Sequence, residues 1–134
     1  MTLYVDSSAL LKRYVAEHDS ARADELLRSD SDLVTARHTV IEVRRNLARL
    51  LEGRTLSESR AAFAEDIRGF ALVELDAATV ELSAKIAELT GARTLDALHL
   101  GAAQRVGGPA LTFLTFDLRQ AQLARTLGFS VVGA

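Results

Sequence analysis

Four carboxylates stand where an α/β fold could bring them to one edge of its sheet: Asp6, Glu42, Asp96 and Asp117. Asp6 directly follows the strand-like run 2–5, and Asp117 directly follows the strand-like run 111–116. Aspartate is also a favoured N-cap, so either residue alone could simply cap the helix that follows it. For each of these two positions, both a capping role and a role in a site stay open.

Asp96 lies on a helix whose surface is almost wholly apolar, so we expect its carboxylate to be buried. An unpaired buried carboxylate costs several kcal/mol. The start of a helix favours an anion by only ~0.3–1 kcal/mol, which is too little to justify the position. The sequence therefore favours a metal ion or a charged partner beside Asp96.

Glu42 falls on the polar stripe of a helix, together with Arg45, Asn46 and Arg49. One interpretation is an ordinary solvated face with a Glu42–Arg45 ion pair. The other is that Glu42 belongs to the same site as the three aspartates, with Arg45 and Arg49 beside it to bind phosphate groups. The residues alone do not decide between the two.

Four clustered carboxylates would repel one another strongly without a cation. A single pair ~4 Å apart already costs ~4 kcal/mol at an effective dielectric constant of about 20. All-oxygen ligands favour Mg²⁺ or Mn²⁺ over Zn²⁺. Such a site can activate a water molecule and stabilise the charge that grows on a phosphodiester. We therefore expect metal-dependent phosphodiester hydrolysis.

The elements that must position these acids alternate along the chain. Strand-like runs cover residues 2–5, 32–36, 70–75, 111–116 and 129–132. Helical periodicity covers residues 7–17, 20–29, 39–52, 55–69, 76–91, 94–106 and 117–127. This alternation predicts an α/β, three-layer α/β/α domain with a central, mostly parallel sheet. In such folds the ligand site lies outside the carboxyl ends of the strands.

Local signals set the expected ends of several helices. Gly53 is expected to end the helix 39–52, and Thr55 with Glu58 has the spacing of a capping box. The expected N-caps are Ser20, Thr55, Asp76 and Thr94.

Composition narrows the class of protein. The 134 residues are 49% hydrophobic, carry a net charge of −2 and include no cysteine. We expect one domain over residues 1–134, without disulfides or thiolate metal sites. The net charge argues against a domain that binds nucleic acid mainly through an overall positive charge. The N-terminus lacks the pattern of a signal peptide and no window resembles a membrane span, so we expect an intracellular protein that does not enter membranes.

Four segments together carry a resemblance to a known family. They are LYVDSSALLKRY, VTARHTVIEVRRNLARL, RTLDALHLGAA and LTFDLRQAQLARTLGFSVV. In order and spacing they resemble the PIN-domain ribonucleases, and more closely the VapC toxins of bacterial toxin–antitoxin pairs. The resemblance implies a PIN-like fold and a cytoplasmic bacterial endoribonuclease that depends on Mg²⁺, with Mn²⁺ as a substitute.

The resemblance also implies a role for each acid. Asp6 and Asp96 match direct metal ligands, and Glu42 and Asp117 match acids that complete the site largely through water. Ser8 matches a family hydroxyl that forms hydrogen bonds within the site. Thr115 could support the site in the same way or be a plain strand residue. Arg119 stands where some relatives carry a fifth acid, so the resemblance leaves the number of ions at one or two.

The partners that the resemblance implies are an RNA substrate, a VapB-like antitoxin and a second copy of the chain in a homodimer. The antitoxin tail is expected to wrap the helices around residues 37–70. The apolar residues Phe63, Ile67 and Phe70 could line a groove for that tail, although core packing is the favoured interpretation.

The residues also bear on other functions. His99 could reach a metal, which would indicate Zn²⁺ or Fe²⁺, but a hydrogen-bonded core histidine is favoured, with His18 and His38 elsewhere and unpaired. A PIN-like module that has lost catalysis and only binds protein is the main alternative. The presence of all four acids favours the enzyme. A phosphatase of another α/β family would need a D-x-D-x-T motif, which this sequence lacks.

Overall fold

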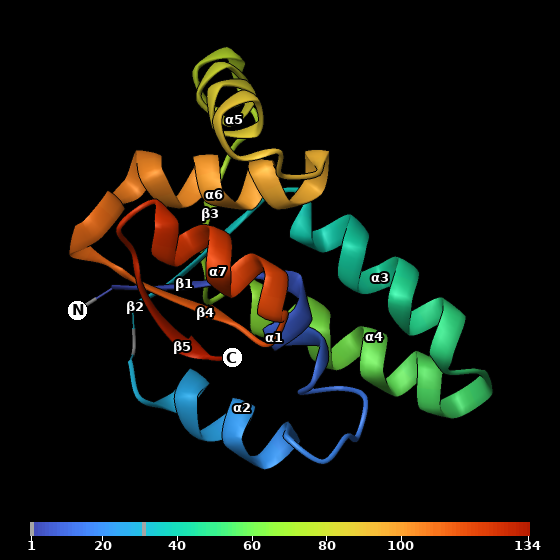
Figure 1. Cartoon of the computed structure of the whole chain (residues 1–134). Helices are drawn as coiled ribbons and strands as arrows, with labels where there is room; N and C mark the ends of the chain where they lie inside the picture. The colour runs from blue at the N-terminus through green and yellow to red at the C-terminus, as the bar shows by residue number, and fades with distance from the viewer. Residues whose placement is uncertain (1, 31) are drawn as a thin grey trace.

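The computed structural model describes residues 2–30 and 32–134, and its strands and helices alternate along the chain (Figure 1). The strands are β1 (Thr2–Val5), β2 (Asp32–Ala36), β3 (Ala71–Val73), β4 (Thr112–Thr115) and β5 (Ser130–Gly133). The helices are α1 (Ser7–Leu11), α2 (Ser20–Arg28), α3 (Thr39–Leu50), α4 (Gly53–Ile67), α5 (Ala77–Thr90), α6 (Thr94–Val106) and α7 (Leu118–Thr126), with a 3-10 turn at Gly108–Ala110.

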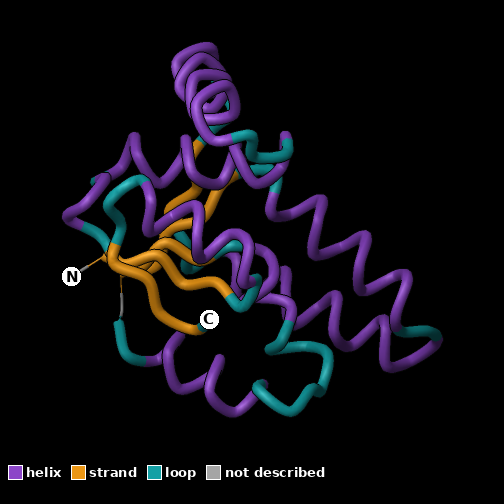
Figure 2. The backbone as a smooth tube through the Cα atoms, viewed as in Figure 1, coloured by secondary structure: helices purple, strands orange, loops and turns teal. Residues whose placement is uncertain are grey.

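The five strands form one parallel sheet in the order β3-β2-β1-β4-β5. Leu3 of β1 pairs with Leu33 on one side and with Thr112 on the other. Helices cover both faces, so the strands are enclosed as Figure 2 shows. The expected three-layer α/β/α fold is therefore confirmed, and the sheet is parallel at every pairing.

Alternate side chains of β1 enter two separate cores. Tyr4 points to the face covered by α5, α6 and α7, where it packs near Leu100 and Phe113. Val5 points to the opposite face, where it joins Leu10 of α1 and other residues of α1–α4. All five of these side chains are fully buried. Because successive residues of a strand face opposite sides, burial on both faces gives the continuous apolar runs seen in the sequence.

The first helix is much shorter than its periodicity predicts. It ends at Leu11, and the next residues form tight turns, with the Tyr14 amide donating to the Leu11 carbonyl three residues earlier. These turns carry Tyr14 out of the helix and onto Phe63 of α4, where the two rings meet edge to face at 5.7 Å. The apolar spacing of residues 7–17 therefore reflected burial, but not one continuous helix.

The expected boundary between α3 and α4 was also wrong. Leu51 is already extended, and Gly53, at φ +60°, is the first residue of α4. Glycine adopts this left-handed conformation without steric cost, which allows the chain to reverse between the two helices. Thr55 therefore lies inside the helix, and the capping box with Glu58 does not form.

Other helix ends match the sequence signals in part. Asp76 caps α5 by accepting from the Thr79 amide at 2.9 Å. The N-cap of α2 is Asp19, and that of α6 is Arg93, one residue before the expected Ser20 and Thr94. Helix ends are usually defined only to within one or two residues, so a one-residue shift at a helix start is expected.

Across residues 2–30 and 32–134, the helices are too short or too polar for any of them to cross a lipid bilayer.

Candidate active site

The sheet topology brings two of the predicted acids to its centre. Asp6 directly follows β1, and Asp117 lies two residues beyond the end of β4. These neighbouring strands continue in opposite directions across the sheet, β1 to β2 and β4 to β5. Parallel sheets place their ligand sites at this kind of switch point, at the carboxyl ends of the strands. The Asp6 amide also donates to the Leu114 carbonyl at 3.1 Å, which fixes the two strand ends side by side.

Asp6 is the most deeply buried of the four acids, with 4% of its surface exposed. Its Oδ1 accepts hydrogen bonds from the Ala9 amide at 3.1 Å and from the Ser8 hydroxyl at 2.7 Å. Asp6 therefore does cap α1. Even so, burial raises the pKa of Asp6, and the charge of His99 and the hydrogen bonds offset this only partly. Capping alone does not stabilise this carboxylate, and a nearby cation would.

Ser8 and Thr115 connect the ends of β1 and β4. Their hydroxyl oxygens lie 3.3 Å apart. The Ser8 oxygen accepts from the Phe116 amide at 3.1 Å, and the Thr115 oxygen accepts from the Asp117 amide at 3.1 Å. The two hydroxyls thus hold the backbone that carries Asp117 next to Asp6.

Asp117 caps α7 by accepting from the Gln120 amide at 3.1 Å. The side-chain nitrogen of Gln120 in turn donates to the backbone carbonyl of Asp96 at 3.1 Å. Gln120 is 1% exposed and so ties α7 firmly to α6. The sequence showed Gln120 only as a residue at capping distance from Asp117, so this link between the two acids was missed.

Asp96 is half-buried, with 20% of its side chain exposed, so its carboxylate is less buried than expected. It lies in the first turn of α6, where Arg93 approaches to 3.6 Å. Burial raises the pKa of Asp96, Arg93 lowers it, and the carboxylates of Asp117 and Glu42 raise it further. The acids therefore lie close enough to repel one another.

Glu42 turns inward and does not lie on a solvated stripe with Arg45, which is exposed. Its Oε1 lies 2.7 Å from His99 Nε2 and 3.4 Å from His38 Nε2. Burial opposes the charge of Glu42, but the hydrogen bond and the positive charge from His99 outweigh burial and lower its pKa. Glu42 is therefore a carboxylate at neutral pH.

Two histidines complete the surroundings of Glu42. His99 is 2% exposed, and its Nδ1 lies 2.7 Å from the Tyr4 hydroxyl, as expected of a hydrogen-bonded core histidine. His38 was expected to lie apart and unpaired, but its ring centroid is 4.2 Å from that of His99. Burial, together with the charge of His99, lowers the pKa of His38 to about 4. The signal that could have identified His38 is its place one helical turn before Glu42.

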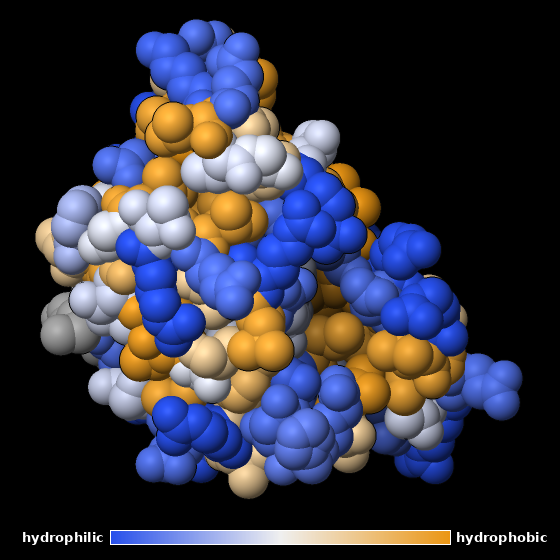
Figure 3. All heavy atoms as spheres, in the orientation of Figure 1, coloured by the Kyte–Doolittle hydropathy of each residue, from blue (hydrophilic) through white to orange (hydrophobic). Residues whose placement is uncertain are grey.

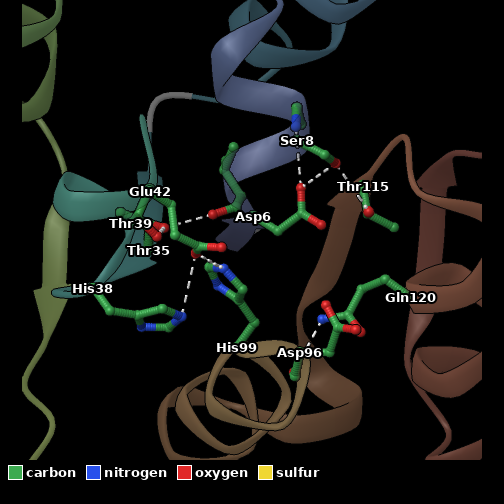
Figure 4. Close-up of polar contacts among 12 residues, drawn as sticks. Asp6, Ser8, Thr35, His38, Thr39, Glu42, Asp96, His99, Thr115 and Gln120 are labelled. Atoms are coloured by element: carbon green, nitrogen blue, oxygen red, sulfur yellow. Dashed lines mark hydrogen bonds and ion pairs between the residues drawn. The ribbon is translucent and has the colours of Figure 1, made fainter. Parts of the chain in front are cut away.

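Figure 4 shows Asp6, Glu42 and His99 close together, with Asp96 approaching from α6. A cavity of about 380 Å³ opens beside them and is lined by Glu42, Arg93, Thr94, Leu95 and Asp96. This cavity is large enough to admit part of a polymer together with hydrated ions.

The acids fit a hard divalent cation. Their donors are carboxylate oxygens, the ligands that Mg²⁺ and Mn²⁺ prefer. Burial raises the pKa values of Asp6 and Asp96, so a cation beside them would stabilise their ionised forms. Among the described residues, the one group of three acid or histidine ligands within 4.8 Å of one another is His38, Glu42 and His99. The four acids are spread more widely, as suits ligands that reach an ion partly through water.

The chain matches a known family over most of its length. The family model of the PIN domain matches residues 3–126. Ribonuclease VapC46 of Mycobacterium tuberculosis is 32% identical over 136 residues, and the match covers 97% of this chain and 95% of the relative.

Solved structures share the fold at lower identity. VapC20 of Mycobacterium tuberculosis, a sarcin–ricin loop cleaving toxin, superposes with a TM-score of 0.72 at 17% identity, over 98% of each chain. A chain of a toxin–antitoxin complex from Klebsiella pneumoniae gives a TM-score of 0.69 at 15% identity, over 90% of this chain and 89% of that one. On its sequence match and its fold, the chain belongs to the PIN domain family and, within it, to the VapC ribonucleases.

Proposed function

We propose that the protein is a Mg²⁺-dependent endoribonuclease and the toxin of a VapBC-type toxin–antitoxin pair. The observation that carries the proposal is that Asp6 and Asp117 follow neighbouring strands at the switch point of the sheet, with Asp96 near Asp117 and Glu42, in a chain of the VapC family. Burial raises the pKa values of Asp6 and Asp96, so a bound cation would stabilise the ionised forms of these two carboxylates.

Each acid has a role that follows from its surroundings. Asp6 and Asp96 would hold the ion directly, and Glu42 and Asp117 would hold it through water. The bound ion would supply the positive charge that activates water and stabilises the phosphodiester as it is cleaved. Ser8 and the Ala9 amide fix the orientation of the Asp6 carboxylate, and His99 keeps Glu42 oriented and ionised.

The RNA would approach along the exposed side of α3. Arg45 and Arg49 are exposed there, one and two helical turns beyond Glu42. Arginine suits this task because its planar guanidinium binds phosphate with two hydrogen bonds. Arg45 also lines a groove of about 390 Å³ with Arg44 of α3 and Arg60 of α4.

The same groove is the proposed contact for the antitoxin. Phe63 and Phe70 do not line it, because both are buried in the core. Its apolar floor comes from Val40 and from Ile41, which is 70% exposed. Figure 3 shows an apolar area among charged residues over α3 and α4. A segment with apolar and acidic side chains would complement this surface, and its binding would block the path to Glu42. The homodimer stays a prediction, which light scattering of the purified protein would check.

The proposal is tested by incubating the purified protein with total RNA in Mg²⁺, in Mn²⁺ and in EDTA. We expect discrete cleavage products with either ion and none in EDTA or with Asp6→Asn. Asp32→Asn is the matched control, because Asp32 is exposed at the opposite edge of the same sheet. Full cleavage in EDTA, or by Asp6→Asn, would overturn the metal-dependent mechanism. Intact RNA under every condition would instead favour a PIN-like module that only binds protein.

A further inference from the structure

His38 has no part in the proposed nuclease mechanism and His99 only orients Glu42, yet both imidazoles meet at that carboxylate. The three side chains bring one ligand atom each within 4.8 Å of one another (Figure 4). His38 and His99 are almost fully buried, and 18% of the Glu42 side chain is exposed. This cluster is a pre-arranged set of two nitrogen donors and one oxygen donor.

His38 is the member of the cluster whose position hydrogen bonding does not explain. Within residues 2–30 and 32–134, neither of its ring nitrogens meets full hydrogen-bond geometry, although only 4% of the residue is exposed; its contact with the Leu95 backbone falls short of that geometry. Its Nε2 is directed at Glu42 Oε1, 3.4 Å away. Buried polar atoms in folded proteins almost always have a partner. An unpartnered imidazole nitrogen beside a carboxylate and a second imidazole therefore indicates a ligand.

The donor set selects the class of ion. Two imidazoles and one carboxylate suit Zn²⁺ and similar borderline metals, whereas Mg²⁺ prefers oxygen donors alone. Ligands at about 2.0–2.1 Å in a tetrahedron lie roughly 3.3 Å from each other. The separation of 3.4 Å between His38 Nε2 and Glu42 Oε1 already has this value. The separation of 2.7 Å between His99 Nε2 and Glu42 Oε1 would have to open by about 0.6 Å, which a small rotation of the Glu42 side chain allows.

Tyr4 provides the support that metal-binding histidines usually have. A ligating imidazole normally donates its second N–H to a neighbouring acceptor, which fixes the ring. The Tyr4 oxygen lies 2.7 Å from His99 Nδ1 and can accept that hydrogen bond when Nε2 binds a metal. Tyr4 is fully buried in the sheet, so its oxygen is held in place.

We propose that His38, Glu42 and His99 form a second metal site, which takes Zn²⁺ or a similar borderline ion, leaves a fourth position to water and shares Glu42 with the site of the hard cation. The regulatory part of this inference rests on the proposed nuclease function. An ion in this site engages the Glu42 carboxylate, so Zn²⁺ inhibits the Mg²⁺-dependent cleavage of RNA.

Binding is tested with Co²⁺, whose visible absorption reports a tetrahedral site with nitrogen ligands, and with Zn²⁺ as the competitor that removes the signal. We expect one equivalent of Co²⁺ in the wild type and in the control His18→Gln, which changes an exposed histidine. His38→Gln and His38→Leu each remove a ligand, and we expect them to weaken binding by more than about tenfold. The leucine variant retains apolar bulk at this buried position, and circular dichroism verifies that both variants fold. Tyr4→Phe deletes only the supporting oxygen, and we expect it to weaken binding by about tenfold to a hundredfold.

Asp96→Asn distinguishes the two sites without any assay of activity. Asp96 is absent from the proposed second site, so this variant is expected to bind Co²⁺ as the wild type does. Loss of the Co²⁺ spectrum in Asp96→Asn, with no loss in folded His38→Gln and His38→Leu, would place the ion among the acids and overturn the proposal.

Inhibition is measured as the ratio of the cleavage rates with and without Zn²⁺, at saturating Mg²⁺, within each variant. We expect Zn²⁺ to slow the wild type and His18→Gln at least tenfold more than His38→Gln. Equal inhibition of all three would refute the sharing of Glu42. A wild type that binds Co²⁺ through His38 but never cleaves RNA would refute the nuclease function and leave the second metal site standing.

Discussion

Replacing Ser8 with alanine is expected to weaken the fold most at the pH where Asp6 is ionised. The Ser8 hydroxyl donates to Asp6 Oδ1 at 2.7 Å and accepts from the Phe116 amide at 3.1 Å. Alanine removes both hydrogen bonds at once. Burial already raises the pKa of Asp6, and the loss of this donor raises it further.

The magnitude follows from the two lost contacts. A hydrogen bond to a charged group contributes about 1.5–3 kcal/mol, and a buried amide left without a partner costs about 1–3 kcal/mol. Ser8 is half-buried, so water can replace part of both, and alanine regains about 0.5 kcal/mol of helix propensity. We therefore expect a net loss of about 2 kcal/mol in the free energy of unfolding at neutral pH, or a fall of roughly 6–10 °C in Tm.

The way in which the loss of stability in Ser8→Ala changes with pH distinguishes a lost hydrogen bond to the Asp6 charge from a general packing defect. A carboxyl whose pKa is raised in the folded state stabilises the fold when it is protonated, and this contribution is lost as the pH rises through the folded pKa. The difference between wild type and Ser8→Ala is therefore expected to be largest at neutral pH and to shrink towards the ordinary Asp pKa of 3.8.

Urea unfolding followed by circular dichroism in EDTA, at several pH values, measures this difference. Ser57→Ala, a serine exposed on α4, is the matched control and is expected to change the free energy of unfolding by less than about 0.5 kcal/mol. A difference for Ser8→Ala that stays constant, or grows as the pH falls, would refute the link between Ser8 and the Asp6 charge.

Three further predictions concern the same structure. Gly101→Ala is expected to destabilise the fold by about 2 kcal/mol in urea unfolding, because its new Cβ would lie 2.0 Å from Ser83 Oγ across the α5–α6 contact; an unchanged free energy would contradict this packing. Mg²⁺ at a hundredfold excess over its Kd is expected to stabilise the wild type by about 2.7 kcal/mol and Asp96→Asn much less, and equal shifts in Tm in thermal scans would show that the ion binds elsewhere. Asp6→Asn keeps a good N-cap but removes a buried charge, so in EDTA at neutral pH we expect it to be at least as stable as the wild type. A clear loss in the free energy of unfolding, measured in urea, would contradict the claim that burial destabilises the ionised Asp6 carboxylate.

The layered architecture could be predicted because it depends on burial, which apolar runs report directly. The strands around Tyr4 and Phe113 are buried on both faces, and this produces uninterrupted apolar sequence. Helix ends were less predictable. Gly53 begins α4 and does not end α3, since a left-handed glycine fits either place and only the packing of the two helices decides.

The site could be predicted as a set of positions but not as a set of contacts. The places of Asp6 and Asp117 follow from strand ends and sheet topology, which sequence periodicity reveals. The approach of His38 to His99 depends on how α3 packs beside α6, across 61 residues of sequence, and no local pattern encodes that distance. For the same reason Asp96 was expected to be buried from its helix alone, whereas in the fold it lines a cavity.

The measurement that tests the central claim most directly is the single-turnover rate of RNA cleavage by Asp96→Asn at saturating Mg²⁺, relative to Asp32→Asn and the wild type. Loss of a metal-binding carboxylate removes several kcal/mol of transition-state stabilisation, so we expect Asp96→Asn to be slower by at least about a hundredfold. Asp32→Asn is expected to cleave at the wild-type rate. If Asp96→Asn cleaves as fast as the wild type, the acids at the switch point of the sheet are not the catalytic site.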